Sequence, residues 1–155
     1  MRDTTIEAWA RAKINLSLEV IGRRGDGYHD VSTVLHEIDI VDRLSFEHGA
    51  DLSLTGDRPR VEPEKILVLK AARLLREQTG CRLGAEIALK MGIPAGTGLG
   101  GGSSDAAMTL RVLNGMWGLG LSDERLLEQA ADLGSDVPFF VNGGCALGEG
   151  RGGLV

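Results

Sequence analysis

A glycine-rich segment that leads directly into a helix-forming sequence is the feature that most restricts the fold of this chain. Six glycines lie between Gly92 and Gly102, and the residues Ser103-Ser104-Asp105-Ala106-Ala107 follow them. Glycine adopts positive φ and lets a ligand approach the backbone closely. Unpaired N–H groups and the positive end of the helix dipole meet at a helix N-terminus, where they favour an anion. The segment therefore predicts a phosphate-binding loop between a strand and a helix rather than a flexible surface loop.

Composition narrows the class of protein. The 155 residues fit one domain, expected over 1–155, and the 43% hydrophobic and 25% charged residues are typical of a globular protein. The net charge of -5 argues against a broad basic face for nucleic acid, and no apolar run has the length of a membrane span. We therefore expect no nucleic-acid partner and no membrane partner.

The cysteines and histidines give no sign of a metal site. Cys81 and Cys145 have neither CxxC nor metal-ligand spacing, and the three histidines form no HExxH pattern. Two reduced thiols are typical of a cytoplasmic protein, so a cytoplasmic location is expected.

Alternating apolar and polar residues predict antiparallel strands near the N-terminus. Residues 14, 16, 18 and 20 are apolar, and they alternate with Lys13, Asn15 and other polar residues. This period of two predicts a half-buried strand with Lys13 and Asn15 together on the face opposite the core. A turn is expected at 22–30, with further strands at 31–40, 43–47 and 51–55.

Helical spacing follows in the second half of the chain. A helix is expected between Pro63 and Gly80, and a strand over 85–90 enters the glycine segment. The next helix is expected to begin at Ser103 or Ser104 as N-cap, with Asp105 in its first turn as a favourable partner of the dipole. Another helix is expected from Ser122, its N-cap, to Gly134. Together these elements predict an α+β fold, and the glycine-rich tail at 152–155 is expected to continue as a strand or turn.

Two common phosphate loops fit poorly. The P-loop requires GxxxxGK[ST], and no lysine follows the glycines here. The dinucleotide fingerprint GxGxxG is matched by residues 96–101, but it also requires an acidic residue at the end of a strand about 20 residues further on. The acids at that distance, Asp123 and Glu124, open a predicted helix instead.

Four motifs in a fixed order match a third class. They are Ala12–Leu16 (AKINL), Gly27-Tyr28-His29, Gly98–Ala107 (GLGGGSSDAA) and Gly134–Phe140 (GSDVPFF). In this combination the chain, from Ala12 to about Gly150, resembles the GHMP small-molecule kinases. The resemblance implies the N-terminal domain of that family, with a mixed or antiparallel sheet packed by helices. It also implies a second, C-terminal domain that is missing here and would complete the site.

The resemblance implies an ATP-dependent, Mg²⁺-assisted phosphotransferase with an alcohol as acceptor. The motifs best match the branch that phosphorylates the 2-hydroxyl of a cytidine diphosphate-linked methylerythritol, in the non-mevalonate route to isoprenoid precursors. One position departs from the pattern: Ile66 stands where the family commonly has an asparagine near the nucleotide base. The residues that contact adenine therefore stay unassigned.

Roles for individual residues follow from the same resemblance. Asp136 would accept or orient the proton of the attacking hydroxyl, although an aspartate before Pro138 also suits a cap. Lys13 would meet Asp136 at that hydroxyl, and Asn15 would contact the substrate. Tyr28 and His29 would recognise cytidine, although they also fit a simple pair beside a turn. The nucleotide phosphates would be held by Pro94, Gly96, Gly98, Leu99, Gly100, Gly101, Gly102, Ser103 and Ser104.

Two alternatives remain at this point. In the first, the chain is part of another kinase of the family, of the homoserine or mevalonate type. In the second, it is a nucleotide-binding domain that has no catalytic turnover by itself. The pair Tyr28-His29 favours a nucleotide-linked acceptor over the former. For the latter, small-molecule sites often lie between two domains, so the loss of one domain would leave nucleotide contacts without closure over the acceptor.

Overall fold

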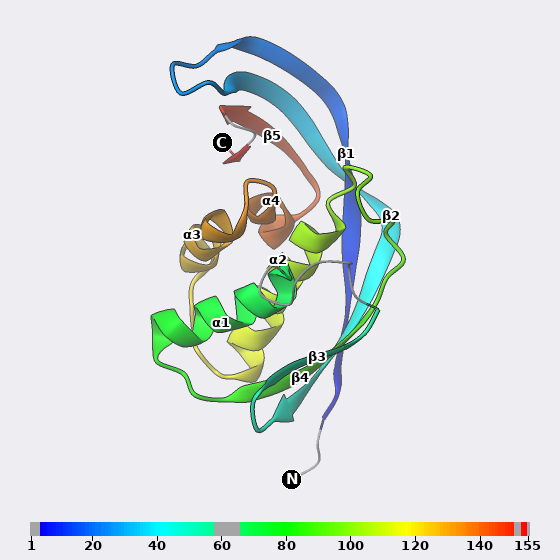
Figure 1. The fold of residues 1–155 in the computed structure, drawn as a ribbon, viewed down its shortest axis with the longest axis vertical. Helices are drawn as coiled ribbons and strands as arrows, with labels where there is room; N and C mark the ends of the chain where they lie inside the picture. Colours follow the sequence, from blue (N-terminus) through cyan, green and yellow to red (C-terminus); the bar gives the residue numbers. More distant parts are fainter. Residues whose placement is uncertain (1–3, 58–65, 151–152, 155) are drawn as a thin grey trace.

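The computed structural model describes residues 4–57 and 66–150, and the backbone of 153–154. Figure 1 shows a curved sheet with the helices packed against its concave side. The strands are β1 (Ile6–Arg23), β2 (His29–Gly49), β3 (Leu52–Gly56), β4 (Gly84–Lys90), β5 (Cys145–Gly150) and β6 (Gly153–Leu154). The helices are α1 (Leu67–Thr79), α2 (Gly101–Met116), α3 (Asp123–Leu133) and α4 (Val137–Asn142). The predicted α+β class and mixed sheet are confirmed.

The long strand β2 organises the sheet. One of its edges pairs with β1 in an antiparallel register, from Ile6 opposite Phe46 to Arg23 opposite His29. Its other edge pairs with β4 near its C-terminal end and with β5 near its N-terminal end, both antiparallel. The outer strand β3 runs parallel to β4, and β6 extends the sheet beyond β5. Residues 153–154, in the tail that was expected to form a strand or turn, form the strand β6.

The separate strands predicted at 31–40 and 43–47 are wrong, because β2 runs unbroken through both. The strand β2 is continuous because both of its edges are paired. β1 pairs with one edge along nearly the whole length of β2, and β4 and β5 pair with the other edge. Irregularities on the β1 side, between Arg11 and Ala12 and between Asn15 and Ser17, absorb the curvature without ending either strand.

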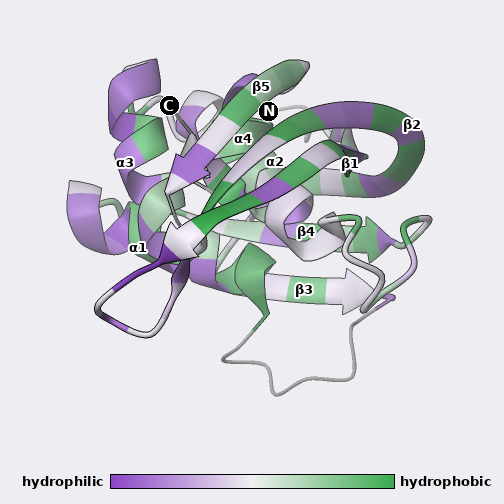
Figure 2. Cartoon of the chain, turned by 90° about the horizontal axis from the view of Figure 1, so that it is seen from above, coloured by the Kyte–Doolittle hydropathy of each residue, from purple (hydrophilic) through white to green (hydrophobic). Residues whose placement is uncertain are grey.

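The predicted orientation of the first strand is also wrong. Leu16, Leu18 and Val20 are 60–62% exposed, whereas the lysine placed opposite the core, Lys13, is buried. Two causes account for this. The irregularity before Ala12 changes which residues of β1 face inward, and the outer half of the hairpin extends beyond the helices. Figure 2 shows the resulting hydrophobic stretches along the hairpin, in contrast to the hydrophilic residues on α1 and α3.

The core lies between the inner half of the sheet and the helices. Leu44 and Phe46 of β2 and Ile87 of β4 are fully buried, and so are Leu110 and Leu113 of α2. Among the helices of the described ranges, none has the length and apolar character needed to cross a membrane.

The helix α1 begins at Leu67, after the extended and buried residue Ile66. The predicted stop at Gly80 is confirmed, because Gly80 has a φ of 69° and forms the C-cap. Pro63, which the sequence placed before this helix, lies outside the described residues. The strand predicted at 85–90 is confirmed as β4.

The prediction of a serine N-cap for α2 is wrong. The helix begins at Gly101, and Gly100, three residues before Ser103, occupies the cap position with a φ of 75° and without a side-chain hydrogen bond. A tight glycine turn replaces the serine cap, and the Gly100 carbonyl accepts from the Ser104 N–H at 2.9 Å. Asp105 consequently lies beyond the first turn, which contains no acidic residue, and it is buried.

The predicted cap of α3 is confirmed, and it yields a stability test. Ser122 has an extended backbone, and its hydroxyl accepts from the Arg125 N–H at 3.3 Å. We expect Ser122→Ala to lower the free energy of unfolding by about 1 kcal/mol, whereas Ser122→Asp preserves it. Denaturant titration of the three chains measures this. Equal stability of the alanine and aspartate variants would mean that the cap contributes nothing.

Candidate active site

The glycine-rich segment forms a hollow of about 300 Å³ at the start of α2. Gly96 and Gly98 have φ values of 70° and 76°, and nothing lies within 4 Å of the position that a Cβ would occupy on either. The backbone there is thus open to a ligand, and it leads into the positive end of a helix. Of the residues predicted to hold phosphate, eight line this hollow: Pro94, Gly96, Gly98, Leu99, Gly100, Gly101, Gly102 and Ser103.

Ser104 is the ninth, and the structure places it elsewhere. It is buried and lines a separate hollow of about 180 Å³ with Trp9, Met108 and Phe140, among others. Ser104 lines this second hollow, although Gly102 and Ser103, the residues just before it in the helix, line the hollow of the glycine segment. Ser103 thus lies beside the glycine segment, and the phosphate contact of Ser104 stays a prediction.

Lys13 joins the sheet to the end of the glycine segment. Its N–H donates to the Leu99 carbonyl at 2.9 Å, and its side-chain stem packs beside Gly100. A Cβ on Gly100 would stand 3.2 Å from Lys13 Cγ and 2.9 Å from Phe140 Cζ. The absence of a side chain at Gly100 therefore allows strand, loop and α4 to meet at one point.

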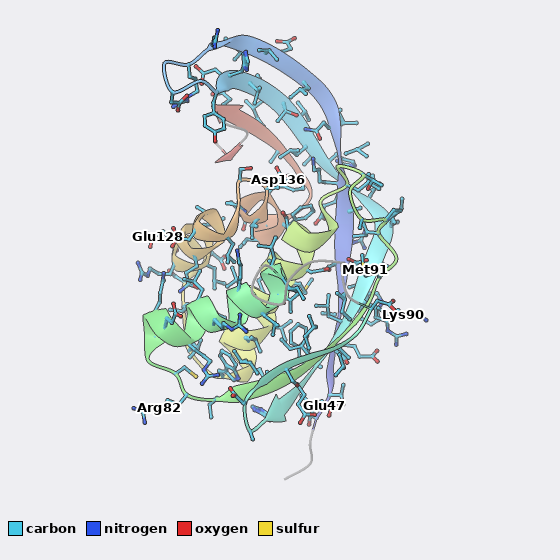
Figure 3. The ribbon with its side chains drawn as sticks, in the orientation of Figure 1. Glu47, Arg82, Lys90, Met91, Glu128 and Asp136 are labelled. Atoms are coloured by element: carbon cyan, nitrogen blue, oxygen red, sulfur yellow. The ribbon has the colours of Figure 1, made fainter. Side chains whose placement is uncertain are left out.

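Lys13 and Asp136 face each other at this point. Lys13 Nζ lies 3.9 Å from Asp136 Oδ2, and the two side chains are 8% and 38% exposed. Asp136 precedes α4 but makes no capping hydrogen bond, so its carboxylate is available to the pair. Figure 3 shows Asp136 on the side of α4 toward the overhanging hairpin. The arrangement is a nearly buried cation beside a carboxylate that solvent or a substrate can reach.

Asn15 fixes the lysine from the other side. Lys13 Nζ donates to Asn15 Oδ1 at 2.8 Å, and Asn15 Nδ2 donates to Thr33 Oγ1 at 2.7 Å. Thr33 in turn donates to the Ser17 carbonyl at 2.6 Å. The predicted common face of Lys13 and Asn15 is thus confirmed, but it points toward the helices. Thr33 was not predicted, because no local pattern distinguishes it from other strand threonines.

Tyr28 and His29 lie at the far end of the hairpin. His29 is the register partner of Arg23, ten residues along β1 from Lys13, and both Tyr28 and His29 are exposed. Asp26 orders the turn, because its carboxylate accepts from the Tyr28 N–H at 3.1 Å. The hairpin end curves back above α3 and α4 (Figure 1), on the side where Asp136 lies.

Two buried acids lie beneath the glycine segment. Asp42 Oδ1 accepts from the N–H groups of Gly92 and Ile93 at 2.7 and 2.8 Å. Burial, then the charge of Asp42 and a hydrogen bond with it, raise the pKa of Asp105 to about 9. The sequence analysis missed Asp42, although a signal existed. Asp42 shares the period-two face of Leu44 and Phe46, and this spacing could have shown that an acid lies inside the core.

A larger hollow of about 440 Å³ lies against β1 to β4, near Glu7, Arg43 and Asp57. Arg43 is already paired with Glu7 there, at 3.0 Å, and it also lies over the Trp9 ring. This hollow contains neither the glycine segment nor the Lys13–Asp136 pair, so we assign the candidate site to the smaller one.

Known proteins are similar to this chain in sequence. Curated relatives include proteins from Pelotomaculum thermopropionicum, 53% identical over 95% of this chain, and from Ralstonia nicotianae, 51% identical over 92%. Both are named 4-diphosphocytidyl-2-C-methyl-D-erythritol kinase. The matches cover 52% and 50% of the two relatives, so the chain spans about half the length of the curated relatives it matches.

Solved structures share the fold. A crystal structure of 4-(cytidine 5'-diphospho)-2C-methyl-D-erythritol kinase superposes with a TM-score of 0.84 at 39% identity, over 95% of this chain and 53% of that one. Homoserine kinase from Cytophaga hutchinsonii gives 0.63 at 20% identity, over 90% of this chain and 42% of that one, a likeness of fold alone. The family model described as GHMP kinases N terminal domain matches residues 67–144, about half of the chain. This chain therefore belongs to the GHMP kinase N-terminal domain family.

Proposed function

We propose that this chain is the N-terminal, nucleotide-binding half of a two-domain kinase. The kinase would transfer the γ-phosphoryl group of ATP to the 2-hydroxyl of 4-diphosphocytidyl-2-C-methyl-D-erythritol, for isoprenoid precursor synthesis in the cytoplasm. The observation that carries the proposal is the Lys13–Asp136 pair beside the glycine segment, in a chain 53% identical to a kinase of that name. The second half of such relatives would provide the remaining wall of the acceptor site.

The proposed reaction assigns a task to each part of the site. The backbone N–H groups of the segment from Gly96 to Ser103 bind the nucleotide phosphates at the helix N-terminus. The acceptor hydroxyl oxygen bonds to the γ-phosphorus as the bond to ADP breaks, and the hydroxyl proton passes to the Asp136 carboxylate. The Lys13 ammonium stabilises the negative charge that develops on the transferring group, while Asn15 holds the lysine in position.

Mg²⁺ neutralises phosphate charge in reactions of this type. Within the described ranges, no group of three or more His, Cys, Asp or Glu side chains is arranged to hold a metal ion. Mg²⁺ would therefore arrive with the nucleotide, held chiefly by phosphate oxygens and water.

Tyr28 and His29 would recognise the cytosine ring of the acceptor, the first by stacking and the second through a base edge. Their position on the curved hairpin suits a long acceptor that reaches from the hairpin end to Asp136. An acceptor of the homoserine or mevalonate type has no base to occupy them.

An ADP-release assay tests the function. Under the proposal, a longer form that carries both halves releases ADP with the cytidylylated acceptor and not with homoserine or mevalonate. The 155-residue chain binds ATP and releases ADP more slowly or not at all. Turnover with homoserine or mevalonate instead would overturn the acceptor assignment. Failure of both forms to bind nucleotide would overturn the kinase assignment itself.

A further inference from the structure

Asp42 and Asp105 are two buried carboxyl groups that the proposed phosphoryl transfer does not use. Asp42 lies on β2 and is 0% exposed, and Asp105 lies on α2 and is 4% exposed. Asp42 Oδ2 and Asp105 Oδ1 have no hydrogen-bond donor within the described part of the chain. Two ionised carboxylates in this setting would repel each other with their facing oxygens unsatisfied.

A single proton removes this conflict. Asp105 and Asp42 are within hydrogen-bonding reach of each other. If Asp105 carries the proton, its O–H donates to Asp42, whose other oxygen already accepts two backbone N–H groups. In this pair Asp42 accepts through Oδ2, since its other oxygen is already held by the two backbone N–H groups.

The two acids lie close to both ends of the glycine segment. Asp42 holds the N–H groups of Gly92 and Ile93, where the chain enters the segment. At the other end, a Cβ on Gly101, the first residue of α2, would lie 3.4 Å from Asp42 Oδ2. Asp105 is four residues after Gly101 and therefore lies on the same side of the helix.

We propose that Asp42 and Asp105 share one proton and act as a positioning pair, which clamps the entrance of the glycine segment to the first turns of α2. Without the clamp, the two ends of the segment separate and its N–H groups no longer converge. The role in nucleotide binding rests on the proposed function. The shared proton does not, because it follows from the buried acids alone.

The other charged side chains on the elements around α2 do not lie beside Asp105. On β1, Lys13 faces Asp136 of the segment before α4, and Lys70 of α1 is exposed. The charged side chains of α3 are likewise exposed. Asp42 is thus the charged group that acts on Asp105.

Three variants test the pair. Asp105→Asn keeps a donor to Asp42 but cannot titrate, whereas Asp105→Leu has a similar size and removes the donor. Asp132→Asn, on the exposed surface of α3, is the control for loss of a carboxylate. At pH 7 we expect ADP affinity within about twofold of the unmodified chain for the asparagine variants, and at least about tenfold weaker for Asp105→Leu. Equal affinities of Asp105→Asn and Asp105→Leu would overturn the clamp.

A pH profile gives a second readout that does not depend on the nucleotide. The folded chain keeps the Asp105 proton up to about pH 9, whereas the unfolded chain releases it near 3.8. The folded state therefore binds more protons between these values, and its stability falls as pH rises through that window. Relative to Asp105→Asn, the unmodified chain should lose stability steadily from about pH 4 to pH 9.

Parallel stability profiles for the unmodified chain and Asp105→Asn would overturn the shared proton, even if Asp105→Leu fails to fold. A chain that shows the expected pH profile but binds no ADP would retain the proton pair and reject the proposed function instead.

Discussion

Replacing Asp136 with asparagine is expected to lower the turnover of the proposed two-domain kinase by about 10²–10⁴-fold while ATP affinity changes little, because the amide cannot take the hydroxyl proton. Asparagine has nearly the same shape, so the packing at the start of α4 is preserved. The glycine segment, which would bind the phosphates, is not altered. Single-turnover rates and nucleotide titrations in a form that carries both halves separate these two effects.

The control is Asp132→Asn, which removes one exposed carboxylate four residues earlier in the chain. It should leave both rate and affinity unchanged. Lys13→Met should resemble Asp136→Asn in its loss of turnover, since the two groups lie 3.9 Å apart and, in the proposed reaction, the lysine stabilises the charge on the transferring group while the aspartate takes the proton. If Asp136→Asn raised KM and left kcat unchanged, Asp136 would bind the acceptor rather than take its proton.

Local sequence patterns predicted helices and strands well where the adjacent residues alone determine where an element begins or ends. The glycine stop of α1 and the serine cap of α3 depend on a few adjacent backbone groups, and both are confirmed. The strand β4 has a clear apolar pattern between turn residues and is confirmed as well. The order of four short motifs predicted the family, which the match to the N-terminal domain confirms.

The sequence patterns failed where contacts with distant segments of the chain determine which side chains are buried. Period-two alternation states that Leu16, Leu18 and Val20 share a face, but not whether a helix covers it. The irregularity before Ala12 then turned Lys13 inward, and no turn residue or glycine at that position indicates it. The same limit applies to Asp105, whose environment depends on Asp42, 63 residues earlier in the printed sequence. Its role as a simple dipole partner was therefore the natural but wrong prediction.

In the candidate site, too, some features follow from local sequence and others depend on contacts between distant segments. The positive φ and open backbone at Gly96 and Gly98 were predictable from residue type alone, since glycine adopts both readily. The meeting of Lys13 with Asp136 was implied only by the family resemblance. In the fold it arises because Lys13 pairs with the Leu99 carbonyl and its stem passes beside Gly100.

Among the glycines of the segment that have a positive φ, Gly96, Gly98 and Gly100, the change Gly100→Ala should be the most disruptive single-methyl change. The new Cβ would stand 2.9 Å from Phe140 Cζ and 3.2 Å from Lys13 Cγ, and the residue would keep a φ of 75° that alanine rarely adopts. Phe140 cannot easily move, because it is buried and stacks edge-on against Phe139. Strain and overpacking together should lower the free energy of unfolding by roughly 2–5 kcal/mol and displace Lys13 from Asp136.

Two matched variants separate the causes of this loss. Gly98→Ala imposes the same left-handed strain, at a φ of 76°, with no atom within 4 Å of the new methyl group, so it should cost only about 1–2 kcal/mol. Gly115→Ala, within α2 and equally open, should stabilise the chain by about 0.5–1 kcal/mol. Denaturant titration of the three chains compares their free energies of unfolding.

Equal losses of stability for Gly100→Ala and Gly98→Ala would mean that Phe140 and Lys13 move to make room for the methyl group. Strand, loop and α4 would then meet loosely at Gly100, and the lysine–aspartate pair would lack the rigid support that phosphoryl transfer requires.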